Sequence, residues 1–258
     1  PTTLERLVVG QPTRRRNAMA KPNGFTAYRG PSLLDGVPIV SKVTGTQRPS
    51  DNPKTGPMLQ QFVLVDGVKP TEALKTGQDE SVCGDCAHRP FKIRQIKEAH
   101  KQGLRLEEKP DVPCYVAVFM APTSVWKTEY PDMADVEPSK YAVRLGAYGN
   151  PDSVPIEVNR AIIAMGNGWH TGYTHNWRTC DQAYAEILMA SVDSEAEALE
   201  AQAMGWRRFR VRGETEPLMK DEVACPASKE SGYRTTCARC GLCSGNKLRA
   251  KSVAIIEH

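Results

Sequence analysis

The spacing of apolar residues predicts strands and helices that alternate along most of the chain. Short apolar runs bounded by glycine, proline or charged residues are typical of buried strands. Such runs lie at residues 37–40, 61–65, 114–119, 141–146, 170–174, 187–191, 207–211 and 252–256. The first two flank a turn-rich segment, 51–56, and we expect them to form a β-hairpin.

Three segments have the pattern of helices. Residues 70–75 carry a proline in the first turn. In 151–165 the apolar side chains are spaced for one helical face, and Gly166 follows. The segment that begins at Ser194 has a glutamate three residues later, which is the spacing of a capping box, and it ends at Gly205.

This order of elements predicts the fold class. Strand–helix–strand units with short connections favour parallel pairing and a right-handed crossover. We therefore expect an α/β fold, a partial (β/α) barrel of the TIM type, with mostly parallel strands and an amino-terminal β-hairpin region. We expect residues 1–22, which contain three consecutive arginines, to form a flexible arm before a single domain of residues 23–258.

The strongest chemical motif is the run Cys237-Ala-Arg-Cys240-Gly-Leu-Cys243. Three thiolates at this spacing can face one side of a tight loop, and Cys225, followed by Pro226, supplies a fourth. All-cysteine ligation with a Cys-Pro pair is typical of [4Fe–4S] clusters. A structural zinc site also takes four thiolates. Both metals fit this set, and the three-cysteine run with its Cys-Pro pair favours iron–sulfur.

The remaining cysteines are further candidate ligands. Eight cysteines in a chain with no recognisable secretion signal are better explained as metal ligands than as disulfides. Cys83 and Cys86, with His88 beside them, fit half of a zinc site, a redox pair, part of the same site as the carboxy-terminal run, or an inert turn. Cys114 and Cys180 fit small buried residues, and Cys114 is the better ligand candidate of the two.

Candidate substrate-binding residues follow several predicted strands. Ligands of parallel α/β sheets bind at the carboxyl ends of the strands, and we expect polar groups and cysteines to converge on that single rim. His175 has the chemistry of a general base and Asp193 that of a nucleophile or acid. Arg144, Trp177 and Arg178 are candidates to bind a base and a phosphate. The plainer interpretation makes Trp177 a packed anchor, Arg178 a solvated charge and Asp193 an acid at a helix amino terminus.

The charge pattern is compatible with nucleic acid. The formal net charge is +4, the pI is near 8.6, and residues 89–109 are rich in Lys and Arg, which either contact phosphate or form a solvated face. No apolar run reaches the roughly 20 residues of a membrane helix, and no apolar segment follows the amino-terminal arginines. We therefore expect a cytoplasmic protein without a membrane partner. The motifs of P-loop NTPases, Rossmann dehydrogenases, serine hydrolases and zincins do not occur.

Five motifs spread over most of the chain after residue 24 form a recognisable set. They are YRGPSLLDG at 28–36, VCGDCAH at 82–88, RLGAYG at 144–149, MASVDS at 189–194, and CPAS with TTCARCGLC within 225–243. Together they resemble a protein family encoded by bacteriophages and plasmids, which is distantly similar to radical-SAM-like barrel proteins of phages. The resemblance implies a phage or mobile-element origin, hence the host-cell cytoplasm, and a partial (β/α) barrel. It implies no particular activity.

The chain departs from radical-SAM proteins in one respect. Their C-x-x-x-C-x-x-C loop after the first strand is absent, and the early cysteines Cys83 and Cys86 are only a pair. If Cys225 is a fourth ligand, the carboxy-terminal cluster is closed and S-adenosylmethionine chemistry is not expected. If it is not a ligand, one iron is open to such chemistry.

Three hypotheses of function follow from these residues. The first is an iron–sulfur protein that binds or acts on nucleic acid or a nucleotide. The second is a zinc-dependent enzyme that modifies nucleobases, with Asp193 as nucleophile or acid. The third is a non-enzymatic protein, such as an antagonist of host defence, with a host or phage protein as partner and the metal only as a staple. Metal analysis separates the first from the second, and an Asp193→Ala variant separates the second from the third.

Overall fold

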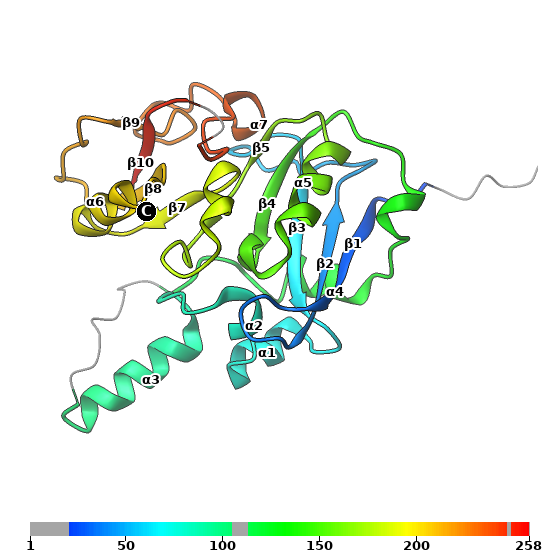
Figure 1. Ribbon diagram of the computed structural model, residues 1–258, viewed down its shortest axis with the longest axis horizontal. Helices are drawn as coiled ribbons and strands as arrows, with labels where there is room; N and C mark the ends of the chain where they lie inside the picture. The colour runs from blue at the N-terminus through cyan, green and yellow to red at the C-terminus, as the bar shows by residue number, and fades with distance from the viewer. Residues whose placement is uncertain (1–20, 105–112, 247–248, 258) are drawn as a thin grey trace, which may run out of the picture.

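The computed structural model describes residues 21–104, 113–246 and 249–257 (Figure 1). The predicted arm, residues 1–22, lies almost entirely outside the described residues.

The first sheet combines an antiparallel meander with two parallel strands. It contains β1 (Gly24–Pro31), β2 (Pro38–Thr44), β3 (Met58–Val65), β4 (Ala142–Tyr148) and β5 (His170–Thr171), in that order across the sheet. The β1–β2 and β2–β3 pairs are antiparallel, and the β3–β4 and β4–β5 pairs are parallel. The predicted hairpin is therefore confirmed as β2 and β3, and β1 extends it.

The second sheet is parallel throughout. Its strands are β6 (Tyr173–Thr174), β7 (Met189–Val192), β8 (Arg208–Arg212), β9 (Glu222–Ala224) and β10 (Ser252–Ile256). They lie in the order β6-β7-β8-β10-β9, so β10 enters between β8 and β9. The structure thus confirms a mixed α/β fold with mostly parallel strands.

The two sheets meet at Gly172, within the single strand predicted at 170–174. The Gly172 N–H donates to the carbonyl of Cys243 (2.9 Å), and the Gly172 carbonyl accepts from the N–H of Met189 (3.0 Å). A Cβ at this position would lie 2.6 Å from Cδ2 of Leu188, so only glycine fits without displacement. The chain therefore passes from one sheet into the other at a residue without a side chain.

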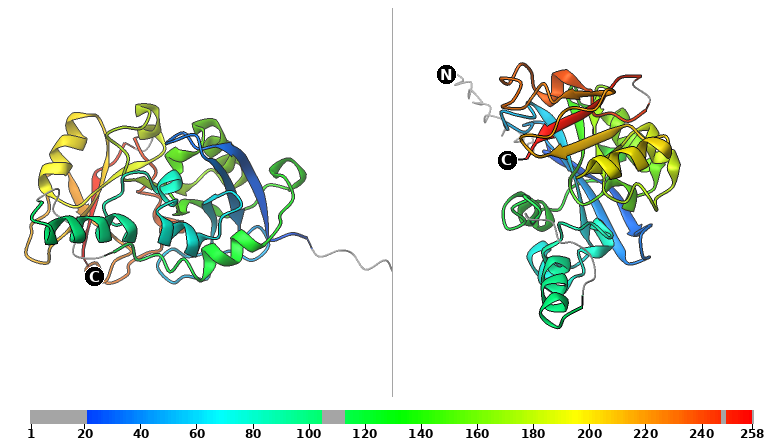
Figure 2. Two further views of the ribbon diagram at one scale, coloured as in Figure 1. Left: turned by 90° about the horizontal axis from the view of Figure 1, so that it is seen from below. Right: turned by 90° about the vertical axis from the view of Figure 1, so that its left-hand side faces the viewer.

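Seven α-helices among the described residues connect these strands. They are α1 (Pro70–Thr76), α2 (Glu80–Cys83), α3 (Pro90–Lys101), α4 (Ala121–Lys127), α5 (Ile156–Met165), α6 (Glu195–Ala203) and α7 (Cys237–Cys240). Short 3₁₀ turns lie at Met133–Asp135, Pro151–Ser153 and Gln182–Glu186. The first four helices lie below the first sheet in Figure 1, where α3 stands away from the body, and α7 lies at the top. Figure 2 shows the same arrangement from two further sides.

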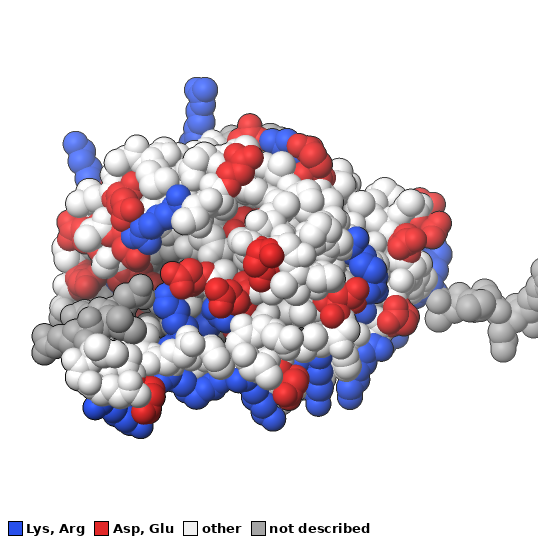
Figure 3. Space-filling view, turned by 60° about the horizontal axis from the view of Figure 1, so that its bottom comes forward, with Lys and Arg blue, Asp and Glu red and all other residues white. Residues whose placement is uncertain are grey.

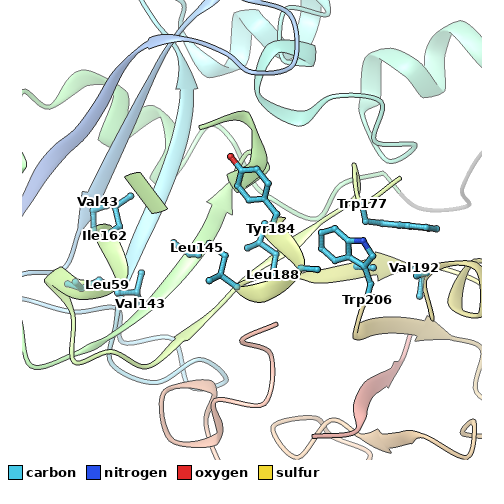
Figure 4. Packing of buried hydrophobic residues seen from close by; sticks show 14 of the residues in the cluster. Val43, Leu59, Val143, Leu145, Ile162, Trp177, Tyr184, Leu188, Val192 and Trp206 are labelled. Atoms are coloured by element: carbon cyan, nitrogen blue, oxygen red, sulfur yellow. The ribbon is translucent and has the colours of Figure 1, made fainter. Parts of the chain in front are cut away.

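One hydrophobic cluster runs across both sheets. Val43 and Val143 come from the first sheet, Val192 comes from the second, and the buried rings of Trp177 and Trp206 close the far end (Figure 4). A second cluster packs α1 and α4 against β3, and a third lies beneath the carboxy-terminal cysteines. The largest cluster therefore holds the two sheets together as one packed unit.

Two predicted elements differ from the structure. Residues 114–119 do not form a strand: the N–H of Cys114 donates to the carbonyl of His88 (2.9 Å), and the segment then turns into α4. The helix predicted at 151–165 begins only at Ile156, after a 3₁₀ turn, because Pro155 occupies the N-cap position.

The surface carries both signs of charge. Lys and Arg side chains gather along the lower margin of the view in Figure 3, and Asp and Glu are frequent above them. On α3, Arg94, Lys97 and Lys101 are exposed as the helical spacing predicts, whereas Arg89 is buried and pairs with Asp79 (3.0 Å). Among the helices that the structure describes, none is long and apolar enough to cross a membrane.

Candidate metal centre

The four carboxy-terminal cysteines lie together. Cys225 directly follows β9, Cys237 and Cys240 begin and end α7, and Cys243 lies in the next turn. Cys225, Cys237 and Cys243 share one hydrophobic cluster with Val253 of β10. The negative charge of any one thiolate in the group raises the pKa of its neighbours, as Cys240 does for Cys225 and Cys237. Cys225 thus lies close to the later run in the fold.

A glycine and a neighbouring loop fix the shape of the cysteine run. Gly241 has φ 63°, and a Cβ there would lie 2.5 Å from the ring of Trp169, so a larger residue would be both strained and obstructed. The N–H of Cys237 donates to the carbonyl of Lys54 (3.1 Å), and the next N–H donates to Thr55 (2.9 Å). The run therefore docks on the segment before β3, a contact that no local sequence signal indicates.

The surroundings of these thiols both oppose and favour their charged form. Burial raises the pKa of Cys225 and Cys237, and it raises the pKa of Cys243 to about 12. Lys54 acts against this shift at Cys225 and Cys237, and Arg144 does so at Cys237. The thiols are therefore neutral without a metal, and metal binding would release their protons.

Two of these thiols have a neighbouring group that acts against the effect of burial. The Ala227 N–H lowers the pKa of Cys225, and the hydroxyl of Tyr173 lowers that of Cys243. Hydrogen-bond donors beside a sulfur lower the pKa of its thiol and adjust the potential of a bound cluster.

The donor set fits a cluster or a zinc ion, but the thiols are not placed for one. Among the residues that the structure describes, no group of three or more His, Cys, Asp or Glu side chains is arranged so that it could hold a metal ion. A cysteine has a single side-chain torsion with three staggered positions, so sulfurs on a suitable backbone reach a metal by rotation alone. The chemistry and the closeness of the four thiols therefore fit a metal or cluster. Their side-chain torsions would rotate when it binds.

A second group of cysteines lies elsewhere in the fold. Cys83 ends α2, Cys86 follows the next turn, and both the Cys86 and Cys114 thiolates raise the pKa of Cys83, after the larger effect of burial. The side chain of Asn150, just past the end of β4, donates to the carbonyl of Cys83 (2.7 Å). Gly84 has φ 62° and packs directly on the side chain of Asn176, just past β6. This group therefore lies at the carboxyl ends of β4 and β6.

The predicted residues His175 and Asp193 lie next to this second group. His88 Nε2 lies 3.0 Å from a carboxylate oxygen of Asp193, and the rings of His88 and His175 meet edge to face with centroids 5.7 Å apart. Burial lowers the pKa of His175, so its ring is neutral at pH 7. Burial alone would raise the pKa of Asp193, but the hydrogen bond and charge of His88 bring it below the ordinary value. His88 thus joins the two residues that the sequence analysis proposed for catalysis.

The expected single rim is corrected to two separate places. The Cys237–Cys243 run contacts Lys54 and Trp169, which precede β3 and β5, at the amino ends of those strands. His175 and Asp193 instead follow the carboxyl ends of β6 and β7. The order of residues shows which strand a loop follows, but it does not show which other strand end the loop packs against.

The interactions of Arg144 are with the surroundings of the carboxy-terminal cysteines and not with His175. Burial raises the pKa of Cys237 and of Tyr173, and the guanidinium of Arg144 acts against both shifts. Its Nη2 lies 3.1 Å from the hydroxyl of Tyr115. Beside it on β3, Nε2 of Gln60 is buried without a hydrogen-bond partner among the described residues. An unpaired buried amide next to a guanidinium is a suitable place for a polar ligand.

Trp177 is not available to a substrate, contrary to the sequence prediction, whereas Arg178 is exposed and ion-paired. Trp177 is 1% exposed, and its indole N–H donates to the carbonyl of Ser191 (3.1 Å). The guanidinium of Arg178 stacks on that indole at 4.0 Å and pairs with Glu197 and Glu200 of α6. The plainer interpretation of a packed anchor holds for Trp177, and Arg178 is an exposed charge that is also ion-paired.

No family model matches the chain, and neither a curated protein nor a solved structure matches it.

Proposed function

We propose that this chain is an iron–sulfur protein whose [4Fe–4S] cluster is held by Cys225, Cys237, Cys240 and Cys243. The observation that carries the proposal is that Cys225 lies close to a cysteine run that is distant from it in the sequence. Among the described residues, no other feature explains why four thiols meet. The Cys-Pro pair and the three-cysteine spacing favour iron–sulfur over zinc. With four protein ligands the cluster is closed, and it cross-links the end of β9 to α7.

The fold is compatible with a finer description. We interpret the two sheets, joined through residues 170–174, as one curled sheet that forms a partial (β/α) barrel. That architecture agrees with the proposed kinship to phage and plasmid proteins. Because Cys225 supplies the fourth thiolate, S-adenosylmethionine chemistry at this cluster is not part of the proposal.

The exposed side chains around the Cys237–Cys243 run favour nucleic acid as the partner. Tyr233 is 62% exposed and has φ 51°, a backbone conformation that a tyrosine rarely adopts and that is often found at functional sites. Trp169, which packs on Gly241, is 53% exposed. Arg234, just before α7, and Arg239, within α7, are both exposed. Exposed aromatic rings with arginines are the usual components of a single-strand nucleic-acid surface.

The cluster proposal is tested by metal analysis of protein purified without oxygen. We expect about four irons with matching sulfide per chain and a brown protein. The Cys240→Ala variant should lose most of this iron because one iron loses its thiolate. The Cys180→Ala variant is the matched control, since Cys180 packs against the first hydrophobic cluster, away from the four cysteines. Zinc without iron in the wild-type protein, or full iron in Cys240→Ala, would contradict the cluster.

The nucleic-acid proposal is tested by fluorescence anisotropy with a labelled single-stranded oligonucleotide at several salt concentrations. We expect the double variant Arg234→Glu and Arg239→Glu to bind about tenfold more weakly, with a smaller salt dependence, because two phosphate contacts become repulsive. The matched control reverses Arg94 and Lys97 on α3. If the control loses as much affinity as the loop variant, or if the wild-type protein does not bind, this part of the proposal is wrong.

A further inference from the structure

A pocket of about 630 Å³ opens at the amino ends of β8, β10 and β9. Its walls come from the segments that lead into these strands: residues from the end of α6 to Arg208, residues 249–252, and Asp221. This end of the parallel sheet is opposite to the one that carries His175 and Asp193, which follow the carboxyl ends of β6 and β7. A volume of this size is usual for the binding site of a small molecule.

The residues that line this pocket are strongly basic. Asp221 is the one acid among the described lining residues, beside four basic side chains, which are those of Arg207, Arg208, Arg249 and Lys251. Both carboxylate oxygens of Asp221 accept from Nη2 of Arg208, at 2.6 and 2.7 Å, so these two charges balance each other. Three positive charges of the lining then remain without an acid to balance them.

Arg207 is the most unusual of these residues, because it is buried without a carboxylate. Its side chain belongs to a residue that is only 9% exposed. Nη1 donates to the carbonyl of Gly245 (2.8 Å), Nη2 donates to that of Lys251 (2.6 Å), and Nε has no hydrogen-bond partner among the described residues. The buried arginines within β8 each pair with a carboxylate, whereas Arg207 makes no such pair among the residues that the structure describes.

A buried guanidinium without a counter-ion favours an anionic ligand. Backbone carbonyls satisfy the N–H groups of Arg207 but carry no net charge, and desolvation of an unpaired ion is costly. Burial accordingly lowers the pKa of Arg207, and a thiolate at Cys243 would act in the opposite direction. Both Nη atoms nevertheless donate to carbonyls and not to that sulfur. An anion in the pocket would supply the missing partner.

We propose that this pocket binds a phosphate group, with Arg207 as a fixed positive charge in its wall and with Arg249 and Lys251 closing on the phosphate oxygens. Arginine and lysine are the usual protein ligands of phosphate, arginine through paired N–H donors and lysine as a point charge. Carbonyls hold Arg207 before any ligand arrives, whereas Arg249 and Lys251 are exposed and can approach it. A phosphate monoester carries about −1.5 to −2 charges at pH 7, which balances most of the remaining positive charge.

This inference goes beyond the proposed function. The pocket shares no residue with the proposed cluster or with the exposed side chains around the Cys237–Cys243 run. Either proposal can therefore fail alone.

The pocket is tested first with inorganic phosphate on the unmodified protein. The melting temperature is measured as phosphate is added, while sodium chloride keeps the ionic strength constant. A ligand that binds only the folded protein raises the melting temperature once its concentration exceeds the dissociation constant. Phosphate also stabilises proteins by its exclusion from their surface, so the specific effect is the difference between the wild type and variants of the pocket.

Two variants isolate that difference. The double variant Arg249→Glu and Lys251→Glu reverses two exposed charges, and we expect it to bind phosphate about tenfold more weakly. Reversal of Arg94 and Lys97 on α3 changes the net charge equally and should leave the response unchanged. Arg207→Gln removes the buried charge but keeps a donor for one carbonyl, and it should abolish the specific response. An equal response in the wild type and the double variant would overturn the proposal, even if Arg207→Gln does not fold.

Two sources share this chemistry, a free phosphate ester and the backbone of a nucleic acid. Titrations with adenosine 5′-monophosphate and with a single-stranded oligonucleotide that lacks a terminal phosphate distinguish them. Whichever probe binds more tightly, and loses that binding when Arg249 and Lys251 are reversed, identifies the source, and either result supports a phosphate pocket. The variant with Arg234→Glu and Arg239→Glu should keep this binding. If neither probe depends on Arg249 and Lys251, the pocket is not a phosphate site.

Discussion

At the residue scale, the most unusual feature outside the cysteine sites is a row of buried arginines on β8. Arg208, Arg210 and Arg212 alternate along the strand and so share one face, and each is 6% exposed or less. Each pairs with a carboxylate, and the partners are Asp221, Glu222 and Glu230. Buried charges are tolerated only with such partners, because desolvation of an unpaired ion costs several kcal/mol. The row therefore fixes the chain after β8 and the position of β9.

The pair of Arg210 and Glu222 gives a prediction for stability. Arg210→Met leaves the carboxylate of Glu222 buried and unpaired, and we expect it to reduce the free energy of unfolding by about 3–5 kcal/mol at pH 7. The double variant Arg210→Met and Glu222→Met should lose clearly less, because neither charge remains. Urea unfolding of the three proteins measures both effects. Equal losses in the single and double variants would contradict this account.

The same pair also gives a pH dependence. Burial alone would raise the pKa of Glu222, but hydrogen bonds from Arg210 and the Met219 N–H hold it below its ordinary value. Its contribution to stability is therefore complete above the unfolded pKa of about 4.3 and is lost as the pH falls through the lower folded value. The difference between wild type and Arg210→Met should accordingly shrink below pH 4.

At the element scale, predictions succeeded where the deciding contacts are local. Helix α6 begins as expected: the Ser194 hydroxyl accepts from the Glu197 N–H (3.2 Å), and the Glu197 carboxylate accepts from the Asp193 N–H (2.8 Å). Every partner lies within four residues. Residues 114–119 have an equally strand-like composition, but their first N–H pairs with His88 and not with a strand. A strand needs a partner, and the partner is absent from the local pattern.

At the scale of the whole molecule, the passage between the sheets depends on Gly172. The hydrophobic cluster that spans both sheets includes Leu145 and Leu188, and these two side chains close around the position where Gly172 has none. A side chain there must push apart the layers that join the sheets. Gly172 is therefore a structural requirement of the join.

Gly172→Val is expected to destabilise the entire fold by about 1–3 kcal/mol, because the side chain overpacks the region between Leu145 and Leu188. The melting temperature, followed by circular dichroism, should fall in a single transition. Gly213→Ala is the matched control: its new Cβ would have 3.7 Å to the nearest atom, on Glu216, and the melting temperature should hardly change. Loss of only one sheet, or equal effects of both variants, would show that the core does not join the sheets as described.

The sequence by itself determined the type of most elements, the parallel character of the sheet, and the cysteines with ligand chemistry. These depend on periodicity, capping and spacing over a few residues, which the order of amino acids displays directly. The proline after Cys225 and the need for a fourth ligand also predicted that Cys225 joins the later run in one ligand set. It could not show that Trp177 is sealed in the core, because an apolar ring next to a charge has the same local pattern on a surface.

Only the tertiary structure decided which distant groups meet. It brought the backbone of Cys114 against that of His88 across α3, and it placed Asp193 against His88. It also placed the Cys237–Cys243 run at the amino ends of β3 and β5, away from that second group. The physical reason is that strand order, here with β10 inserted between β8 and β9, is set by packing across the whole core. No short stretch of sequence contains that information.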